Sequence, residues 1–324
     1  MGSGPPLTDE ERQFCLHAAF LAGAGEFTLW SAGSWLVAQR GWKAGALAAA
    51  AAFALHVLLR GPLSRRGARR LVSCAALLVG GAAAAAGLFL LRGHQAPDAL
   101  RILPLVGAAP LGFLAAAAAA EHVELEKRSR AFAMIDIAQT LGVALGLVQG
   151  AASREIALGA AVIAAAVALP SALVVGRPAE DGCSHAFAIG QSALAMRQRS
   201  FWPALMAALI GGAALMRLAG PGFWWPLAFA ALAVGMRVGA RVGERLGERT
   251  NLLVAVVGLL LFAWIRSRGV SVGLCAGLQW ASAGALLTGL AAAPASSSAE
   301  MLRAPASAVL WSALALGAAL MAVT

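Results

Sequence analysis

The sequence predicts an all-α membrane protein, a polytopic bundle of about 11 transmembrane helices grouped as six and five. Of its 324 residues, 60% are hydrophobic and only 12% are charged, and the mean hydropathy is +0.78. Soluble domains are nearer half apolar and a quarter charged. The apolar runs are about 20 residues long, which lets a helix cross roughly 30 Å of hydrocarbon. The runs are continuous rather than alternating, so they indicate helices and not a β-barrel.

The apolar runs define the predicted spans and the organisation of the chain. A charged segment at 176–200, with Arg177, Pro178 and Asp181, separates two groups of runs. We therefore expect a six-helix N-terminal half over 1–175, a cytoplasmic linker over 176–200 and a five-helix C-terminal half over 201–324. The predicted spans are 14–38, 43–60, 71–92, 100–120, 131–152 and 155–175, then 201–219, 222–240, 251–266, 270–293 and 304–323.

The basic residues predict the orientation of the bundle. Cytoplasmic loops of membrane proteins carry an excess of lysine and arginine. With a cytoplasmic N-terminus, 17 of the 25 lysines and arginines fall in cytoplasmic segments. The sequence therefore predicts a cytoplasmic N-terminus and a C-terminus on the lumenal or external side.

Several classes of function are excluded by composition and motif. The net charge of +10 is explained by membrane topology, so no nucleic-acid partner is expected. No phosphate loop or catalytic triad is present, so the chain is not expected to be an enzyme. The four cysteines, Cys15, Cys74, Cys183 and Cys275, lack metal or redox spacing. No metal site and no cofactor are expected. The partner that the composition predicts is the lipid bilayer.

Glu26 is the sharpest candidate for a functional residue. It lies near the middle of the first predicted span, one helical turn before Trp30. An ionisable group at this depth costs several kcal/mol unless it faces a cavity or a partner. It therefore marks either a site or a paired carboxyl used for packing.

Asp136 and Gln139 form the second candidate group. They lie three residues apart in the fifth predicted span and share a helix face. They are expected to face Glu26 across a central cavity, or Asp136 reaches the cytoplasmic interface instead.

Arg237 and Arg241 are the third candidate group. Together with Arg245 and Arg249 they recur every four residues at the end of the eighth predicted span, so they share one helix face. Such a face is typical of a positive cytoplasmic helix end that suits anionic lipid head groups. The alternative is an interior polar path lined by Arg237 and Arg241.

The loop at 61–70, Gly-Pro-Leu-Ser-Arg-Arg-Gly-Ala-Arg-Arg, resembles the loop between the second and third helices of major facilitator transporters. Ser64 stands where that family has an aspartate. This resemblance implies a major facilitator fold with one helix fewer than usual.

A second resemblance is to equilibrative nucleoside transporters, which also have six spans, a linker and five spans. Gly23-Ala24-Gly25 followed by Trp30 looks like a pattern of that family's first helix, and Gln139 matches a glutamine of its fifth. Arg241 matches an arginine of its eighth helix, but Arg237 replaces an aspartate with the opposite charge. The resemblance implies a nucleoside-type solute carrier whose central cavity is lined by Glu26, Trp30, Gln139 and Arg241.

A third resemblance covers more of the chain, to the multi-spanning envelope protein of alphaherpesviruses encoded by gene forty-three of the unique long region. It is carried by Trp202-Pro203, by Gly220-Pro221-Gly222 before Trp225-Pro226, and by the Asp181-Gly182-Cys183 linker. It implies a non-enzymatic protein of the virion envelope and host-cell membranes. That protein would modulate membrane fusion or trafficking driven by viral envelope glycoproteins. Modulation of fusion is the main functional expectation, and solute transport is the alternative.

Overall fold

A computed structural model describes residues 6–40, 108, 111–150, 168–176, 196–216, 218, 225–269, 272–297 and most of 306–318. Every regular element among these residues is helical. The predicted spans 43–60 and 71–92, the loop 61–70, and most of the linker 176–200 lie outside the described residues. The prediction of 11 helices is therefore not tested as a number.

The chain divides into two compact units. The first comprises Met1–Gly33, Ala50–Gly146 and Arg154–Gln191, and the second Ser34–Ala49, Leu147–Ser153 and Ser192–Thr324. The predicted domains 1–175, 176–200 and 201–324 stay a prediction. Each unit is described by itself below.

The first helix of the N-terminal unit, α1, runs over Asp9–Arg40. Its start is fixed by Thr8 and Glu11, which form a reciprocal cap. The Glu11 backbone N–H donates to Thr8 Oγ1 at 3.2 Å, and the Thr8 backbone N–H donates to Glu11 Oε2 at 2.8 Å. This capping box satisfies backbone donors that the first turn leaves free. The helix accordingly begins five residues before the predicted start of the span at 14.

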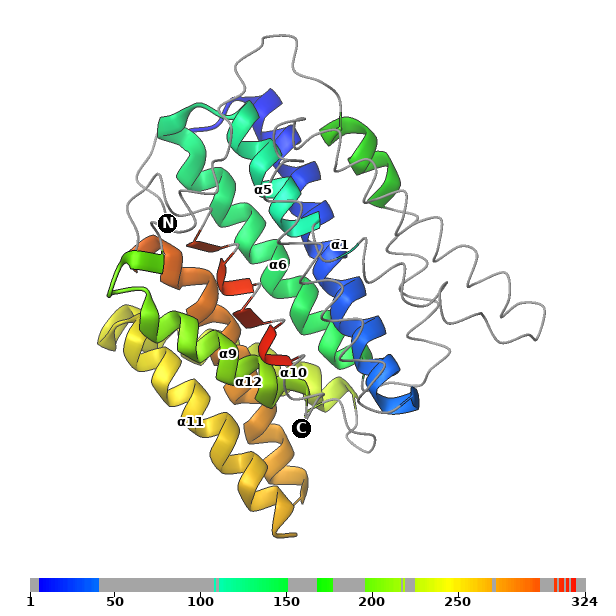
Figure 1. Cartoon of the computed structure of the whole chain (residues 1–324), viewed down its shortest axis with the longest axis vertical. Helices are drawn as coiled ribbons and strands as arrows, with labels where there is room; N and C mark the ends of the chain where they lie inside the picture. The colour runs from blue at the N-terminus through cyan, green and yellow to red at the C-terminus, as the bar shows by residue number, and fades with distance from the viewer. Residues whose placement is uncertain are drawn as a thin grey trace, which may run out of the picture. The chain divides into compact units, whose positions relative to one another are not determined.

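Three further elements complete the described core of this unit: α5 (Leu111–His122), a 3-10 turn η2 (Leu125–Lys127) and α6 (Arg128–Gly150). Figure 1 shows α1 and α6 side by side. They approach closely where Gly23 of α1 meets Ala138 and Gly142 of α6. A Cβ on Gly23 would lie 2.8 Å from the Ala138 carbonyl oxygen, and one on Gly142 would clash with the Gly23 carbonyl. Glycine at both positions therefore permits the backbone contact.

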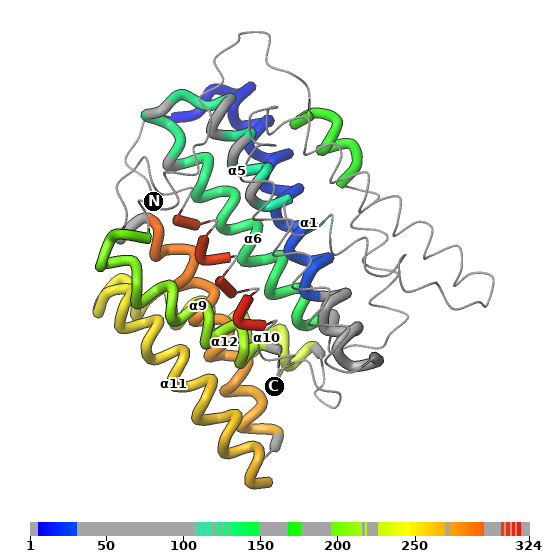
Figure 2. The backbone as a smooth tube through the Cα atoms, in the orientation of Figure 1, coloured from blue at the N-terminus to red at the C-terminus, as the bar shows by residue number. Residues whose placement is uncertain are grey.

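The C-terminal unit contains α9 (Trp202–Met216), α10 (Trp225–Leu246), α11 (Glu248–Ser267) and α12 (Val272–Ser297). In this unit α12 packs against α9, α10 and α11, and Figure 2 traces the four helices. The contacts are again built on small residues: Gly235 of α10 approaches the Ala281 carbonyl of α12, and Gly284 of α12 approaches the Leu232 carbonyl of α10. Close helix contact through small residues is typical of membrane bundles.

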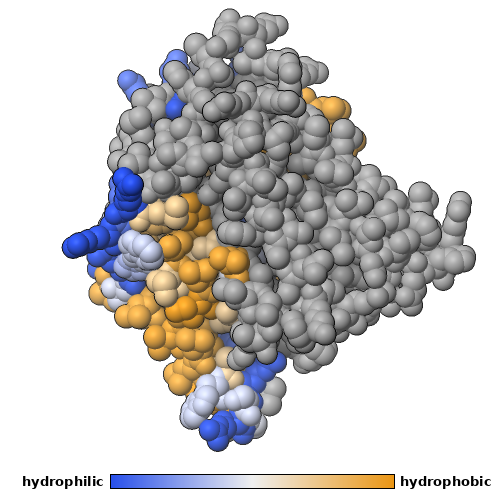
Figure 3. Space-filling view, in the orientation of Figure 1, coloured by the Kyte–Doolittle hydropathy of each residue, from blue (hydrophilic) through white to orange (hydrophobic). Residues whose placement is uncertain are grey.

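A band of apolar side chains covers the outer face of this unit. Large side chains of α11 are exposed at positions that share one helix face, and Figure 3 shows the apolar band with hydrophilic groups at its two ends. Those exposed side chains are Leu253, Val254, Val257, Leu260, Leu261 and Trp264. In water this face would be an aggregation hazard, whereas in lipid it is the expected surface.

Four described helices are long and apolar enough to cross a membrane: Arg130–Val148, Pro226–Leu246, Glu248–Ser267 and Gly273–Pro294. Trp202–Leu215 and Val309–Ala318 are shorter apolar helices. These six fall on the spans predicted at 131–152, 222–240, 251–266, 270–293, 201–219 and 304–323. Because arginine is a good helix former, α10 continues through its arginines to Leu246, six residues past the predicted end at 240.

Candidate functional site

A buried polar cluster in the N-terminal unit is the candidate functional site. Glu26 and Trp30 of α1 and Gln139 of α6 come together, with exposed fractions of 8%, 4% and 4%. The Trp30 indole Nε1–H donates to Glu26 Oε2 at 3.2 Å, and Gln139 is also hydrogen bonded to the Glu26 side chain. The carboxyl group is therefore held by two neutral groups inside an apolar bundle.

A third helix, α5, packs against this cluster through Gly112. A Cβ at Gly112 would clash with Gln139 Nε2 and would lie 3.6 Å from Glu26 Oε1. Gly112 thus leaves the room that Gln139 needs to reach the carboxyl group. Its role was not predicted from sequence, because the residue stands among ordinary small residues of an apolar run.

The buried hydroxyl groups around the cluster are satisfied by their own helices. Thr28 Oγ1 donates to the Ala24 carbonyl at 2.8 Å, and Thr140 Oγ1 donates to the Asp136 carbonyl at 2.7 Å. A threonine that bonds back along its helix offers little to a ligand. The carboxyl and amide groups of Glu26 and Gln139 are therefore the main polar groups of the cluster.

The other predicted site residues lie elsewhere. Asp136 is half-buried one turn before Gln139 on α6. Arg237 and Arg241 are exposed on α10 in the C-terminal unit, on the helix face away from Gly235 and Gly239. That all six predicted residues line one cavity stays a prediction.

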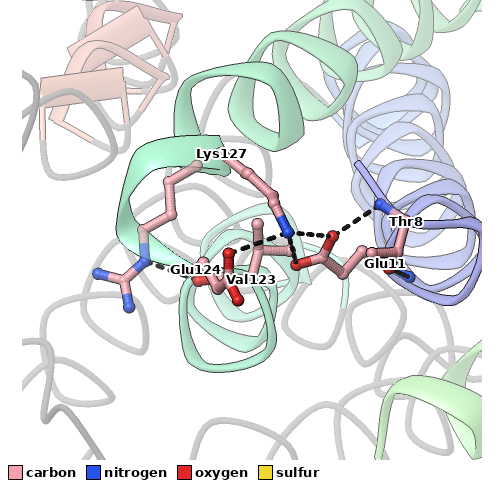
Figure 4. A network of polar contacts seen from close by, with 6 residues as sticks. Thr8, Glu11, Val123, Glu124 and Lys127 are labelled. Atoms are coloured by element: carbon pink, nitrogen blue, oxygen red, sulfur yellow. Dashed lines mark hydrogen bonds and ion pairs between the residues drawn. The ribbon is translucent and has the colours of Figure 1, made fainter. Parts of the chain in front are cut away.

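A second polar network, at the start of α1, was not predicted. Figure 4 shows Lys127 of η2 between two carboxylates, Glu124 at 2.9 Å and Glu11 at 3.3 Å. The signal that could have located its α1 side is the Thr8-x-x-Glu11 capping pattern. The partner Lys127 is 116 residues away along the chain, so no local pattern reveals it.

The electrostatic interactions of this network favour the charged forms of Glu11 and Lys127. Burial at Glu11 opposes ionisation, but the hydrogen bond from the Thr8 backbone, the Lys127 side chain and the Thr8 hydroxyl outweigh it, and the pKa of Glu11 is lowered. The pKa of Lys127 is raised, first by its hydrogen bond to Glu124 and then by Glu11, against its partial desolvation. The network ties the start of α1 to the segment that precedes α6.

No group of three histidine, cysteine, aspartate or glutamate side chains that could hold a metal ion is found in the part of the chain that the structure describes.

The fold is shared with solved membrane transporters. The human organic anion transporter MFSD10 (TETRAN) aligns with 96% of this chain and 92% of its own, with a TM-score of 0.56 and 18% sequence identity. A bacterial homolog of the human lysosomal transporter Spinster, in an inward-facing and occupied conformation, aligns with 98% of this chain and 81% of its own, with a TM-score of 0.61 and 17% identity. The chain therefore shares its fold with these two transporters.

No profile of a known protein family matches the chain, and no curated protein matches its sequence. At 17–18% identity the structural likeness establishes the fold alone. It confirms the coarser prediction, an all-helical membrane protein with a transporter-like fold.

Proposed function

We propose that this chain is a solute carrier, and that Glu26, Trp30 and Gln139 form the polar part of its substrate site. The observation that carries the proposal is the burial of Glu26 between α1, α5 and α6 with only neutral hydrogen-bond partners among the described residues. An ionisable residue inside a membrane bundle is costly and by default functional. The fold that the chain shares with the two transporters supports the same class of function.

The chemistry of the cluster favours a small polar solute with a flat ring. A carboxylate accepts hydrogen bonds, an amide donates and accepts them, and an indole ring stacks on flat apolar faces. Nucleosides combine these features and are the first substrates to test. A solute that donates two hydrogen bonds would compete with Trp30 and Gln139 for the Glu26 carboxyl group.

Uptake into proteoliposomes tests this function. Purified full-length protein would be reconstituted and offered labelled uridine, labelled adenosine and a labelled organic anion, the last because MFSD10 is an organic anion transporter. We expect saturable nucleoside uptake, and a reduction of about tenfold or more in Glu26→Gln, because one lost charged hydrogen bond is worth about 1.5–3 kcal/mol.

Glu10→Gln is the matched control, since Glu10 is an exposed carboxylate on the same helix. It should transport like the unmodified chain. Absence of saturable uptake for every nucleoside would remove the nucleoside assignment. Equal activity of Glu26→Gln and Glu10→Gln would remove Glu26 from the site.

The finer parts of the sequence interpretation belong to the same proposal. They are the equilibrative-nucleoside-transporter-like arrangement of 11 helices, the cytoplasmic N-terminus and the absence of enzymatic activity. A cysteine-labelling topology map, with reporters at Ser3 and at Thr324, tests the two ends directly. Labelling of both ends from the same side would contradict the odd number of spans.

The role in the virion envelope, with modulation of fusion through viral envelope glycoproteins, rests on the sequence resemblance alone. The structural comparisons favour transport over it. Co-expression with fusion glycoproteins tests it: unchanged cell–cell fusion alongside measurable uptake would leave transport as the function.

A further inference from the structure

The junction of α10 and α11 carries a strip of exposed arginines. Arg237, Arg241 and Arg245 follow one another every four residues on α10, and Arg249 lies in the first turn of α11. All four side chains are exposed, and none makes an ion pair or hydrogen bond in the described part of the chain. Among the residues that the structure describes, these positive charges have no ion-pair partner.

The strip lies on the outer face of α10. Gly235 and Gly239 mark the packed face, because Cβ atoms there would meet Ala281 and Ala285 of α12. Arg237 lies two residues from each glycine, about 200° around the helix, so it points away from α12. The arginines are therefore accessible from outside the bundle.

Apolar side chains continue the same face into the span. Val234 and Val238 are exposed by 59% and 52%, and Val238 lies one turn before Arg241 and two turns before Arg245 along the same face. At 1.5 Å per residue, Arg237 and Arg245 are about 12 Å apart along the axis. The face thus carries the two valines, with Arg237 between them, and then Arg241 and Arg245 toward the end of the helix, where head groups would meet it.

The helix junction adds to the positive potential. A single residue, Gly247, separates α10 from α11, and its φ of 86° is open to glycine without strain. No side chain caps the start of α11, so its first backbone N–H groups face the same end as the arginines. Glu244 and Glu248 oppose this field, and the four arginines outnumber them by two.

We propose that the α10–α11 junction binds the phosphate of an anionic phospholipid head group, while the acyl chains lie along Val234 and Val238. Guanidinium groups pair with phosphate oxygens in a bidentate manner, and basic residues beside a membrane are attracted to anionic lipid. The charge complementarity and the adjoining apolar face both fit a lipid rather than a soluble anion. This inference is independent of the solute that the protein carries.

The opposite end of α11 supplies a matched control. Arg268 lies there with its guanidinium carbon 5.2 Å from the centroid of the Trp264 ring, so its charge already has a partner. Arg268→Gln removes one positive charge outside the proposed site. Arg241→Gln with Arg245→Gln removes two charges within it.

Thermal unfolding of the full chain in neutral detergent tests the proposal. Short-chain phosphatidylglycerol, short-chain phosphatidylcholine and inorganic phosphate would be titrated separately. We expect phosphatidylglycerol to raise the Tm at the lowest concentration. Its apparent affinity should fall roughly fivefold for each arginine removed, and should not change in Arg268→Gln. Glu244→Gln should tighten binding, since it removes an opposing charge.

Three outcomes would overturn the proposal. Phosphatidylcholine as effective as phosphatidylglycerol would show that head-group charge is not recognised. An unchanged affinity in the double variant would place the lipid elsewhere. Stabilisation by inorganic phosphate at the same concentration, lost in the double variant, would identify a site for a soluble phosphate instead of a lipid.

Discussion

The two units of this chain differ in whether the ionisable residues of their apolar helices are buried or exposed. In the N-terminal unit Glu26 is buried and hydrogen bonded to Trp30 and Gln139. In the C-terminal unit Arg237 and Arg241 are exposed on α10. Both groups give the same signal in the sequence, a charge within or at the end of an apolar run.

Glycine spacing explains the difference. Gly23, whose position contacts α6, is three residues before Glu26, so the two share a helix face. Gly235 and Gly239, whose positions contact α12, each lie two residues from Arg237, which places the arginine on the opposite face. In this chain Glu26, three residues from a packing glycine, is buried, and Arg237, two residues from two packing glycines, is exposed.

The largest effect is expected from a substitution that breaks the glycine contact between α1 and α6 in the N-terminal unit. Gly142→Leu places a side chain against the Gly23 carbonyl, where even a Cβ would clash, and should cost about 3 kcal/mol, the upper end of the overpacking range. Gly277→Leu is the control, because a Cβ there meets nothing within 4 Å. Thermal unfolding in detergent measures both. Equal Tm values for the two variants would refute the tight crossing.

The next largest effect is a difference in destabilisation between substitutions of two buried tryptophans, one in each unit. Trp30 Nε1 donates to Glu26, whereas Trp280 Nε1 is buried and has no partner among the described residues. Replacement by phenylalanine shrinks the ring equally in both. Trp30→Phe should therefore be more destabilising than Trp280→Phe by about 1–3 kcal/mol, since it leaves the carboxyl group one donor short. An equal or reversed order in denaturant unfolding would contradict the Glu26–Trp30 bond.

A smaller effect is expected at the start of α1. Thr8→Ala removes the capping hydroxyl and should cost about 1 kcal/mol. Thr250→Ala is matched to it, because Thr250 Oγ1 donates to the Leu246 carbonyl and caps no backbone N–H. Hydrogen exchange of the first α1 amides reports the change directly. Faster exchange confined to that turn is the predicted result, and unchanged exchange would exclude the cap.

The smallest effect is a dependence of stability on pH. The folded pKa of Glu11 lies below its ordinary value of 4.5, so its contribution is complete above that pH and is lost as the pH falls through the folded pKa. Lys127→Gln should reduce this acid-dependent loss, because it removes one of the groups that lower the pKa. Acid titration of Tm compares the two proteins. Parallel curves below pH 4.5 would show that Lys127 does not act on Glu11.

Much of the fold was predictable, because apolar run length and continuity determine helices in lipid. The six apolar helices that the structure describes fall on predicted spans. Helix ends were less predictable: α1 begins early at its Thr8 cap, and α10 continues through its arginines to Gly247. Both ends depend on local backbone chemistry that hydropathy does not register.

The site was predictable only where it is local. Glu26 and Trp30 lie four residues apart on one helix, so their proximity follows from helix geometry. Their meeting with Gln139 and Gly112 depends on how α1, α5 and α6 cross, which one sequence does not specify. Burial likewise depends on which helix face a residue occupies, and this is why Glu26 is buried whereas Arg237 is exposed.

The one-residue junction at Gly247 also bears on how the protein enters the membrane. Several arginines make α10 a poor candidate to partition into lipid alone, whereas α11 is apolar over its whole length and bears charge only near its ends. With only Gly247 between them, the two helices leave the ribosome in close succession and can enter as a hairpin. The apolar α11 would then help to hold the arginine-bearing α10 in the membrane.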